Sequence, residues 1–150
     1  YVNKLDKYLY IAYKNNLWLP RGAKGVFGGQ VIGQALVASN DTVSSLLSVH
    51  SVHCYFILPG DPKEDILYYI ENLRDGRSFA TRSVEGRQNG NIIFKMMVQY
   101  HTFEEGSLTY SIPMPKVKYQ PEELISSESA AGRLVLLEDN RLSDGIKEFL

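Results

Sequence analysis

The sequence predicts an α+β domain in which an antiparallel sheet wraps around one long buried central helix. Three observations predict this fold class. Residues 26–44 are apolar nearly all the way round a helix. Several extended runs rich in β-branched and aromatic side chains follow, and Gly, Asn, Asp and Pro separate them. A helix followed by a set of strands, without regular strand–helix alternation, is typical of the α+β class.

The first predicted elements surround the helix. Residues 8–13 are aromatic and β-branched, which predicts a short strand. Residues 15–25 contain Pro20 among turn-forming residues and predict a loop. Within residues 26–44, apolar side chains recur at spacings of one, three and four, so we expect the helix to be buried on nearly every side. Gly33 in its middle costs about 1 kcal/mol relative to Ala, which indicates close packing against a neighbour.

Extended runs and tight turns make up the next part of the chain. The predicted strands are residues 48–58, 65–73, 79–88 and 91–103. The turns between them are residues 59–62 (PGDP), 74–77 (RDGR) and 89–90 (NG), and Asp-Gly and Asn-Gly favour the positive φ of tight hairpins. We therefore expect a meander. A sheet of this length wrapped around one apolar helix is the hot-dog arrangement.

The pattern weakens after residue 104, and we predict a single domain over residues 1–104 with a linker over residues 105–150. Prolines interrupt the linker at several points. Residues 121–129 can begin a short helix, because Pro121 suits the first turn of a helix. Residues 146–150 form another possible helical fragment.

Composition excludes several classes of function. The formal net charge is −1, which gives no excess of positive charge for nucleic acid. The longest stretch without Asp, Glu, Lys or Arg, residues 42–60, contains histidines and serines and predicts no membrane span. Cys54 is the only cysteine, so a disulfide framework and a cysteine-rich zinc site are excluded. We predict no metal and no cofactor. The chain begins at Tyr1 without Met or a signal peptide, and we expect it to be a piece of a longer protein.

Two histidines are candidates for chemistry. His50 and His53 lie three apart in a predicted strand, so we expect them on opposite faces of the sheet, where they cannot share a metal ion. A structural role in the packed sheet is the alternative for each of them. His50 is the better candidate for a polar group beside a reacting carbonyl.

The start of the helix offers a second group of candidates. The Gln30 and Gln34 side chains, one turn apart, can orient a water molecule or donate to a carbonyl oxygen. The backbone N–H groups of Gly28, Gly29 and Gln30 can bind an oxyanion or a phosphate. The alternatives are that Gln30 fixes the entry to the helix and that the glycines allow tight packing.

Four arginines and an apolar stripe have both functional and structural interpretations. The arginines lie on one predicted hairpin and the strand after it, where they can meet the phosphates of an anionic ligand or form a solvated face. They are Arg74, Arg77, Arg82 and Arg87. The stripe in the last strand predicts core or a sheet interface. It consists of Phe94, Met96, Val98 and Tyr100.

Five ordered stretches resemble the first half of the type II acyl-CoA thioesterases, a family that includes the peroxisomal enzymes of eukaryotes. They are residues 26–36 (VFGGQVIGQAL), 50–56 (HSVHCYF), 59–62 (PGDP), 73–79 (LRDGRSF), and 88–90 (QNG) with Ile93-Phe94. Together they cover about residues 22–103. Each stretch alone is weak, but five in this order are specific.

The resemblance implies hydrolysis of fatty acyl-CoA to free acid and CoA, through attack of water on the thioester carbonyl. Family members carry two hot-dog repeats in one chain, so the linker is expected to lead to a second repeat that this chain lacks. The family's catalytic Asp, Ser/Thr and Gln belong to that second repeat. The Asp position corresponds here to Gly33 and the Ser/Thr position to Val49. The chain alone is therefore expected to lack the main catalytic residues.

Site residues follow from the candidates and the resemblance together. His50 is the catalytic candidate of this repeat. The substrate-binding candidates are Gly28, Gly29, Gln30, Gln34, Arg77, Ser78 and Phe79. The expected partners are acyl-CoA and either the second repeat or another copy of the chain. The family places eukaryotic members in the peroxisome and bacterial ones in the cytoplasm.

Two other functions stay open. A non-catalytic acyl-CoA-binding or dimerisation module would bind ligand without turnover. A hydratase or dehydratase on the same fold would need a His with a carboxylate on the central helix, and residues 30–40 contain no Asp or Glu.

Overall fold

A computed structural model describes residues 1–106, 108–126, 129–130 and 132. The chain divides into two compact units, Tyr1–Glu105 and Gly106–Leu150. The first unit holds all the strands and the one long helix among the described residues. The candidate site residues predicted above all lie in the first unit.

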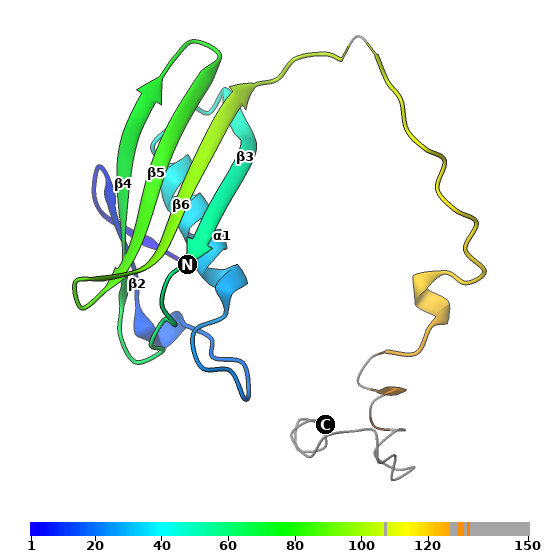
Figure 1. Ribbon diagram of the computed structural model, residues 1–150, viewed down its shortest axis with the longest axis horizontal. Coiled ribbons are helices and arrows are strands. Elements are labelled where there is room, and N and C mark those ends of the chain that lie inside the picture. Colours follow the sequence, from blue (N-terminus) through cyan, green and yellow to red (C-terminus); the bar gives the residue numbers. More distant parts are fainter. Residues whose placement is uncertain (107, 127–128, 131, 133–150) are drawn as a thin grey trace. The chain divides into compact units, whose positions relative to one another are not determined.

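The first unit is built on a six-stranded antiparallel sheet (Figure 1). Its strands are β1 (Asn3–Asp6), β2 (Leu9–Ala12), β3 (Leu47–Phe56), β4 (Ile66–Asp75), β5 (Phe79–Gln88) and β6 (Asn91–Thr102). Their order across the sheet is β1-β2-β4-β5-β6-β3. The predicted strands are all present, and β1 is an additional strand that carries no apolar alternation.

The meander prediction is correct for β4, β5 and β6 but wrong for β3. Turns at Gly76 and at Asn89-Gly90 join three neighbouring strands. Asn89 and Gly90 have the expected positive φ, whereas the positive φ expected from Asp-Gly is absent at Gly76. Strand β3 pairs with β6 instead of β4. The chain after β3 therefore crosses to the other side of the β5–β6 pair, and β3 becomes an edge of the sheet.

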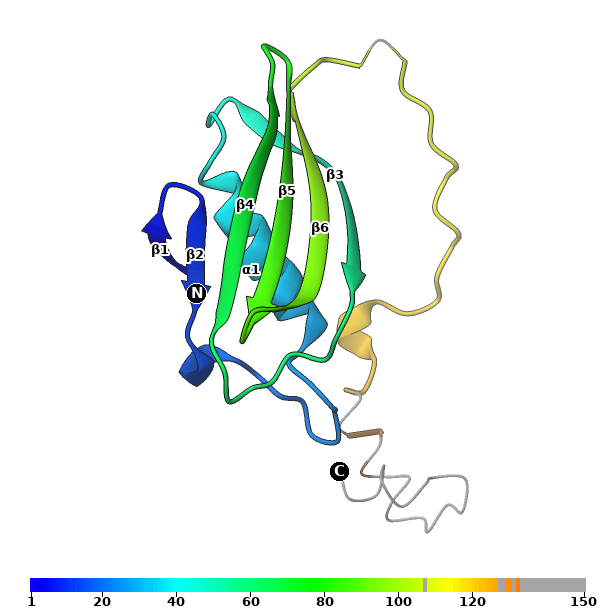
Figure 2. The same cartoon turned by 60° about the vertical axis from the view of Figure 1, so that its left-hand side comes forward.

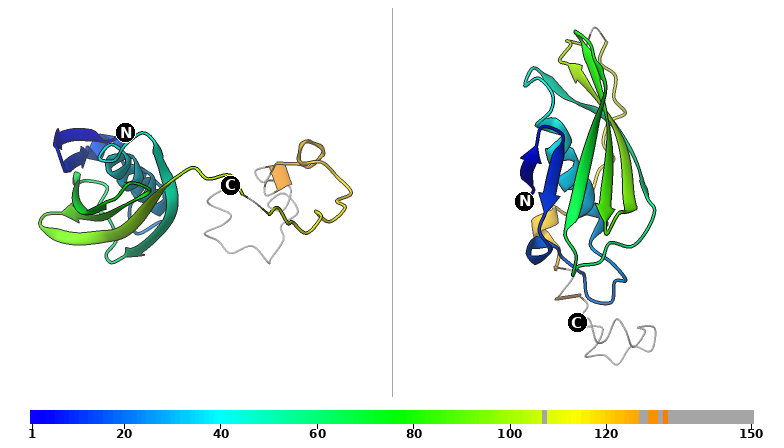
Figure 3. Two further views of the ribbon diagram at one scale, coloured as in Figure 1. Left: turned by 90° about the horizontal axis from the view of Figure 1, so that it is seen from above. Right: turned by 90° about the vertical axis from the view of Figure 1, so that its left-hand side faces the viewer.

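Helix α1 (Gly28–Asn40) packs across the concave face of the sheet, as Figures 2 and 3 show. Its buried side chains lie on one face: Val31, Gln34, Ala35, Ala38 and Ser39. The opposite face is open, and Val37 is 60% exposed. The prediction of one long central helix inside the sheet is confirmed, whereas burial on nearly every side is wrong.

Hydrogen bonds fix the helix to the sheet at two levels. The Tyr68 hydroxyl of β4 donates to Gln34 Oε1 at 2.8 Å, and the Tyr100 hydroxyl of β6 contacts Ser39 Oγ at 2.8 Å. Both tyrosines are fully buried. Burial raises the pKa of both phenols above their ordinary value, so they stay neutral.

Among the described residues of the second unit, Pro121–Glu123 and residues 129, 130 and 132 are helical. A 3₁₀ turn covers Pro121–Glu123, and Gln120 caps it. The helix predicted over residues 121–129 is interrupted, because Leu124, Ile125 and Ser126 are not helical, although Ser129 is. The fragment predicted at residues 146–150 lies outside the described residues.

Candidate functional site

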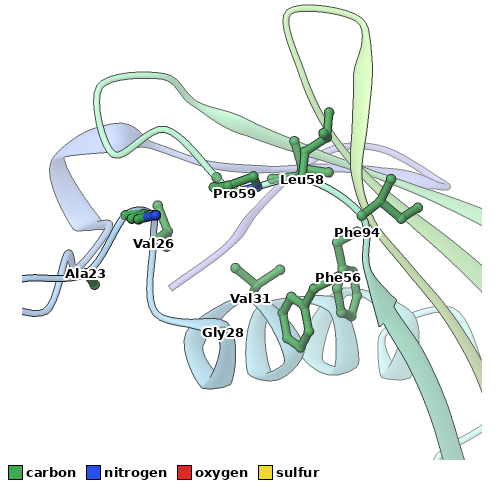
Figure 4. Close-up of a pocket in the computed structure, with 13 residues that line it drawn as sticks. Ala23, Val26, Gly28, Val31, Phe56, Leu58, Pro59 and Phe94 are labelled. Carbon is green, nitrogen blue, oxygen red and sulfur yellow. The ribbon is translucent and has the colours of Figure 1, made fainter.

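A cavity of about 470 Å³ opens beside the first turn of α1 (Figure 4). It lies where the loop before α1 meets the segment after β3 and the start of β6. The side chains that line it are apolar except for that of Lys24. The lining residues are Ala23, Lys24, Gly25, Val26, Gly28, Val31, Phe56, Ile57, Leu58, Pro59, Gly60, Ile93 and Phe94. Among the substrate-binding candidates, only Gly28 lines this cavity.

Glycines at the cavity wall allow close contacts that a side chain would obstruct. A Cβ at Gly25 would lie 2.9 Å from Pro59 Cβ, and one at Gly28 would lie 2.9 Å from Phe56 Cζ. The Val26 N–H donates to the Gly60 carbonyl at 2.9 Å and joins the two loops. These contacts explain why glycines stand in the loop before α1 and at its first residue.

Gln30 holds the loop that leads into the helix. Its Oε1 accepts from the Trp18 backbone N–H at 2.8 Å, and its Nε2 donates to the Asn16 carbonyl at 2.5 Å. Trp18 packs against Phe27 at a ring separation of 5.0 Å. Both polar ends of the Gln30 amide are therefore used by the backbone, which favours the structural alternative. Gly29 lies on the exposed side of the first turn.

Gln34 is buried against the sheet. Its Oε1 accepts the hydrogen bond from Tyr68, while its Nε2 lies 3.5 Å from the Tyr1 carbonyl. The side chain also lines a second, apolar cavity on the open side of α1, together with Gly33 and Val37. Gln34 thus links the core to the exposed helix face.

We expect Gln34→Leu to destabilise the domain by about 1–3 kcal/mol, because the buried Tyr68 hydroxyl then keeps only the Val31 carbonyl, 3.5 Å away, as an acceptor. Tyr68→Phe should cost a similar amount. The double variant should cost less than the sum of the two, since neither polar group then remains unpaired. Urea unfolding measures all three, and strictly additive losses would contradict the coupling.

His50 lies on the convex face of the sheet, away from α1. It is the extra residue of a bulge in β3, where Val49 pairs with Tyr100 and Ser51 pairs with Gln99. Its ring lies 5.6 Å from that of His101 and 6.1 Å from that of Phe79. His50 therefore belongs to an aromatic cluster at the β4–β5 hairpin end of the sheet.

The prediction that His50 and His53 occupy opposite faces is wrong. His53 pairs with Met97, which lies between the inward-facing Met96 and Val98 and so points outward. The bulge shifts the alternation by one residue, so both histidines lie on the convex face. No group of three metal-ligating side chains occurs within the described residues.

Arg77, Ser78 and Phe79 form the tip of the β4–β5 hairpin. The Phe79 ring packs on His101 with 4.1 Å between the ring centroids, and the Ser78 carbonyl accepts from the Thr102 N–H at 3.0 Å. His50 and the cavity residue Phe56 lie about 20 Å apart along β3, at 3.3 Å per residue. The structure thus separates the candidates into two groups at opposite ends of the sheet.

The four arginines do not form a common face. Arg82 points inward and is 1% exposed, while Arg87 bonds Glu85 and lies over the Tyr69 ring. A solvated face is therefore wrong for Arg82, because the inward positions of β5 alternate with its outward ones. The predicted core role of the β6 stripe is confirmed, since all four of its side chains are buried.

Gly33 and Val49 lie on the open side of α1. Gly33 and Val37 line one shallow cavity there, and Val49 lines the next with Val37. A Cβ at Gly33 would meet nothing within 4 Å. The close packing expected around Gly33 is thus absent, because the helix face that carries it is uncovered.

Sequence reasoning missed most of the first cavity. Phe56, Ile57 and Leu58 form one of its edges, and they are large, apolar and exposed. One feature of the sequence could have indicated this edge. The apolar run at the end of the predicted strand leads directly into the Pro-Gly turn, with no polar residue between them.

Comparison with known proteins shows that the chain is similar to acyl-CoA thioesterases. Residues 16–103 match the family model of the acyl-CoA thioesterase N-terminal domain. Acyl-coenzyme A thioesterase 8 of Rattus norvegicus is 41% identical over 125 residues, covering 83% of this chain and 38% of the relative. The peroxisomal acyl-coenzyme A thioester hydrolase 1 of Saccharomyces cerevisiae is 42% identical over 81 residues, covering 54% of this chain and 23% of the relative.

Solved structures share the fold. The acyl-CoA thioesterase II TesB2 of Mycobacterium marinum aligns with a TM-score of 0.65 at 34% identity, covering 77% of this chain and 40% of the other. The hot-dog fold is therefore confirmed. This chain spans less than half of the length of these relatives. Within the described part of the chain, no helix is long and apolar enough to cross a membrane.

Proposed function

Because this chain belongs to the acyl-CoA thioesterase family, we propose that it is the N-terminal half of a double hot-dog enzyme that hydrolyses fatty acyl-CoA to free acid and CoA. One observation carries the proposal. The chain matches the N-terminal domain of the family along residues 16–103 and covers only 38% of a long relative. This repeat then positions and shapes the substrate, while the second repeat supplies the main catalytic groups.

The residues Gly33 and Val49 support the assignment of the main catalytic groups to the second repeat. The family's Asp and Ser/Thr positions correspond to these two residues, which lie on either side of Val37 on one exposed surface. Neither residue offers an acid, a base or a hydroxyl group. Activation of water for attack on a thioester needs such a group within hydrogen-bonding reach.

Substrate contacts from this repeat come from two places in the proposal. Gly28 and Gly29 open α1 with backbone N–H groups that suit a developing oxyanion, whereas the Gln30 N–H already donates to the Phe27 carbonyl at 3.0 Å. Arg77, with Ser78 and Phe79, lies at the hairpin tip, where a guanidinium suits a phosphate of CoA. His50 is the side chain of this repeat that we propose for an additional contribution.

The partner is a second hot-dog repeat or, for the chain alone, another copy of itself. The yeast relative's name places that protein in the peroxisome. We propose the peroxisome for the protein that carries this chain, with the cytoplasm as the alternative.

We expect the 150-residue chain alone to release no CoA thiol from fatty acyl-CoA above the uncatalysed rate. Adding a C-terminal repeat from a relative should restore turnover, because the missing acid and hydroxyl are then present. A thiol-trapping dye measures the release. Turnover by the folded chain alone that His50→Ala abolishes would overturn the half-enzyme proposal and place a working site in this repeat.

A non-catalytic binding module is the second candidate. It is supported by the same lack of acid and hydroxyl at Gly33 and Val49. It predicts binding of acyl-CoA without turnover even when the C-terminal repeat is supplied.

A further inference from the structure

The cavity beside α1 has a buried apolar floor and an exposed apolar rim. The floor is made by Val26, Val31, Ile93 and Phe94, all of which are buried. The rim is made by Phe56, Ile57 and Leu58, each about half exposed. Lys24 is the only charged residue that lines the cavity, and it is exposed. Three successive large apolar side chains in water are unfavourable unless something covers them.

Backbone hydrogen bonds hold the rim in place. The N–H groups of Ile57 and Leu58 both point to the Ile93 carbonyl, at 2.9 Å and 3.2 Å. On the facing side, Val26 is joined to Gly60. The rim therefore cannot close onto the floor without breaking these bonds. The cavity is preformed, as ligand sites usually are.

We propose that this cavity takes the acyl chain of the substrate, and that the Phe56 ring sets how long a chain it accepts. The inference rests on the proposed function, which supplies the class of ligand. A volume of about 470 Å³ falls within the range of small-molecule sites. Burial of the acyl chain against an uncharged floor is favourable, because apolar surface leaves water. Burial of the CoA phosphates there would be unfavourable, because they would lose their hydration.

Phe56 occupies the space that Gly28 leaves free. Its Cζ lies 2.9 Å from the position of a Cβ on Gly28, and its ring centroid lies 5.3 Å from that of Phe94. The ring thus stands between the first turn of α1 and the floor. Removing the ring lengthens the cavity along the helix, and a larger residue at Leu58 on the rim shortens it.

Calorimetric titration of the 150-residue chain tests the assignment, with CoA and saturated acyl-CoAs from butanoyl to dodecanoyl as probes. Affinity should rise about fourfold for each added methylene until the cavity is full, and then level off. Phe56→Ala should move the levelling point to longer chains. Leu58→Trp should move it to shorter ones.

Two matched controls lie outside the cavity. Tyr69→Ala removes a partly exposed aromatic ring from the convex face of β4. Leu73→Trp enlarges a leucine that is 45% exposed, against 48% for Leu58. Both should keep the levelling point of the unmodified chain. Thermal unfolding shows which variants are folded, and either cavity variant alone is sufficient for the test.

A chain-length dependence that is flat, or that levels at the same length in every folded variant, would overturn the inference. The proposed function fails separately, in the thiol-release assay with the C-terminal repeat present. Hydrolysis with an unmoved length preference would overturn the cavity assignment alone. A shifted levelling point without any hydrolysis would support the cavity as the acyl-chain site and would overturn the proposal that the protein is a thioesterase.

Discussion

Replacing Arg82 by Met is expected to destabilise the domain by about 3–5 kcal/mol, a large part of the stability of a domain of this size. Arg82 is 1% exposed and donates to five acceptor atoms in four residues, besides its own neighbour in β5. Its Nε donates to Thr42 Oγ1 at 2.9 Å, and its Nη2 donates to the Thr42 carbonyl at 2.9 Å. Its Nη1 donates to Asn72 Oδ1 at 2.7 Å and to the Arg74 carbonyl at 3.0 Å. The fifth acceptor is Asp75 Oδ1, which accepts from Nη2 at 2.7 Å.

Methionine nearly keeps the length of the side chain but removes every donor. The carbonyls of Thr42 and Arg74 then lose their hydrogen-bond donor inside the protein. The free energy lost is larger than hydrogen bonds to water can restore. The guanidinium also ties the turn after α1 to the end of the β4–β5 hairpin, so its loss should loosen both. Urea unfolding at neutral pH measures the change, and a loss below about 1 kcal/mol would contradict the role of Arg82 as a clamp.

Asp75→Asn provides the matched control. The Asp75 side chain is 57% exposed, and the pair with Arg82 is therefore partly screened by water. Its replacement should cost at most about 1 kcal/mol, because the amide oxygen still accepts the hydrogen bond. The Arg82 and Asn72 hydrogen bonds hold the pKa of Asp75 below its ordinary value. This carboxylate therefore stabilises the domain above its ordinary pKa and loses that contribution as the pH falls through the lowered one, so the difference between Asp75→Asn and the unmodified chain should shrink in acid.

Much of the fold could be predicted because local signals agree with it. Asp-Gly and Asn-Gly supply the turns on either side of β5, and apolar runs supply the strands. Strand β1 could not be found, because residues 3–6 (NKLD) are all exposed and hold their place by pairing with β2. The position of β3 beside β6 depends on which strands pair across the sheet, and no local spacing encodes that.

The candidate site was less predictable for related reasons. The bulge at His50 reverses the expected faces, and a bulge leaves no signal in a strand that lacks Gly and Pro. Arg82 falls at an inward position of β5, but its partner Thr42, after α1, lies 40 residues away in the sequence. Its partners in β4 meet it only through the pairing of β4 with β5. The cavity forms only where three segments of the chain meet. Of the residues that line it, the sequence analysis named only Gly28 as a site residue.

The chain alone is expected to form a dimer through strand β3. The two edges of the sheet differ in how they are protected against pairing. Strand β1 has four residues, carries Lys4 and Asp6 and contains a bulge, all of which oppose pairing with another strand. Strand β3 has ten residues and no Lys, Arg, Asp, Glu or Pro. Beside it lie the exposed Val37 and Leu46. A long, uncharged and partly apolar edge is a template for a further strand.

Ser51→Lys together with His53→Lys should weaken this dimer by about 2 kcal/mol, or roughly thirtyfold in the dissociation constant. Both residues lie on the convex face near the middle of β3, where antiparallel pairing about a two-fold axis brings like charges together. Sedimentation equilibrium measures the constant. The control Glu71→Lys adds positive charge on β4, which lies inside the sheet, and should leave the dimer intact. If the double lysine variant stays as tightly dimeric as the control, the copies meet through another surface, and if the unmodified chain is monomeric, the β3 edge does not drive association.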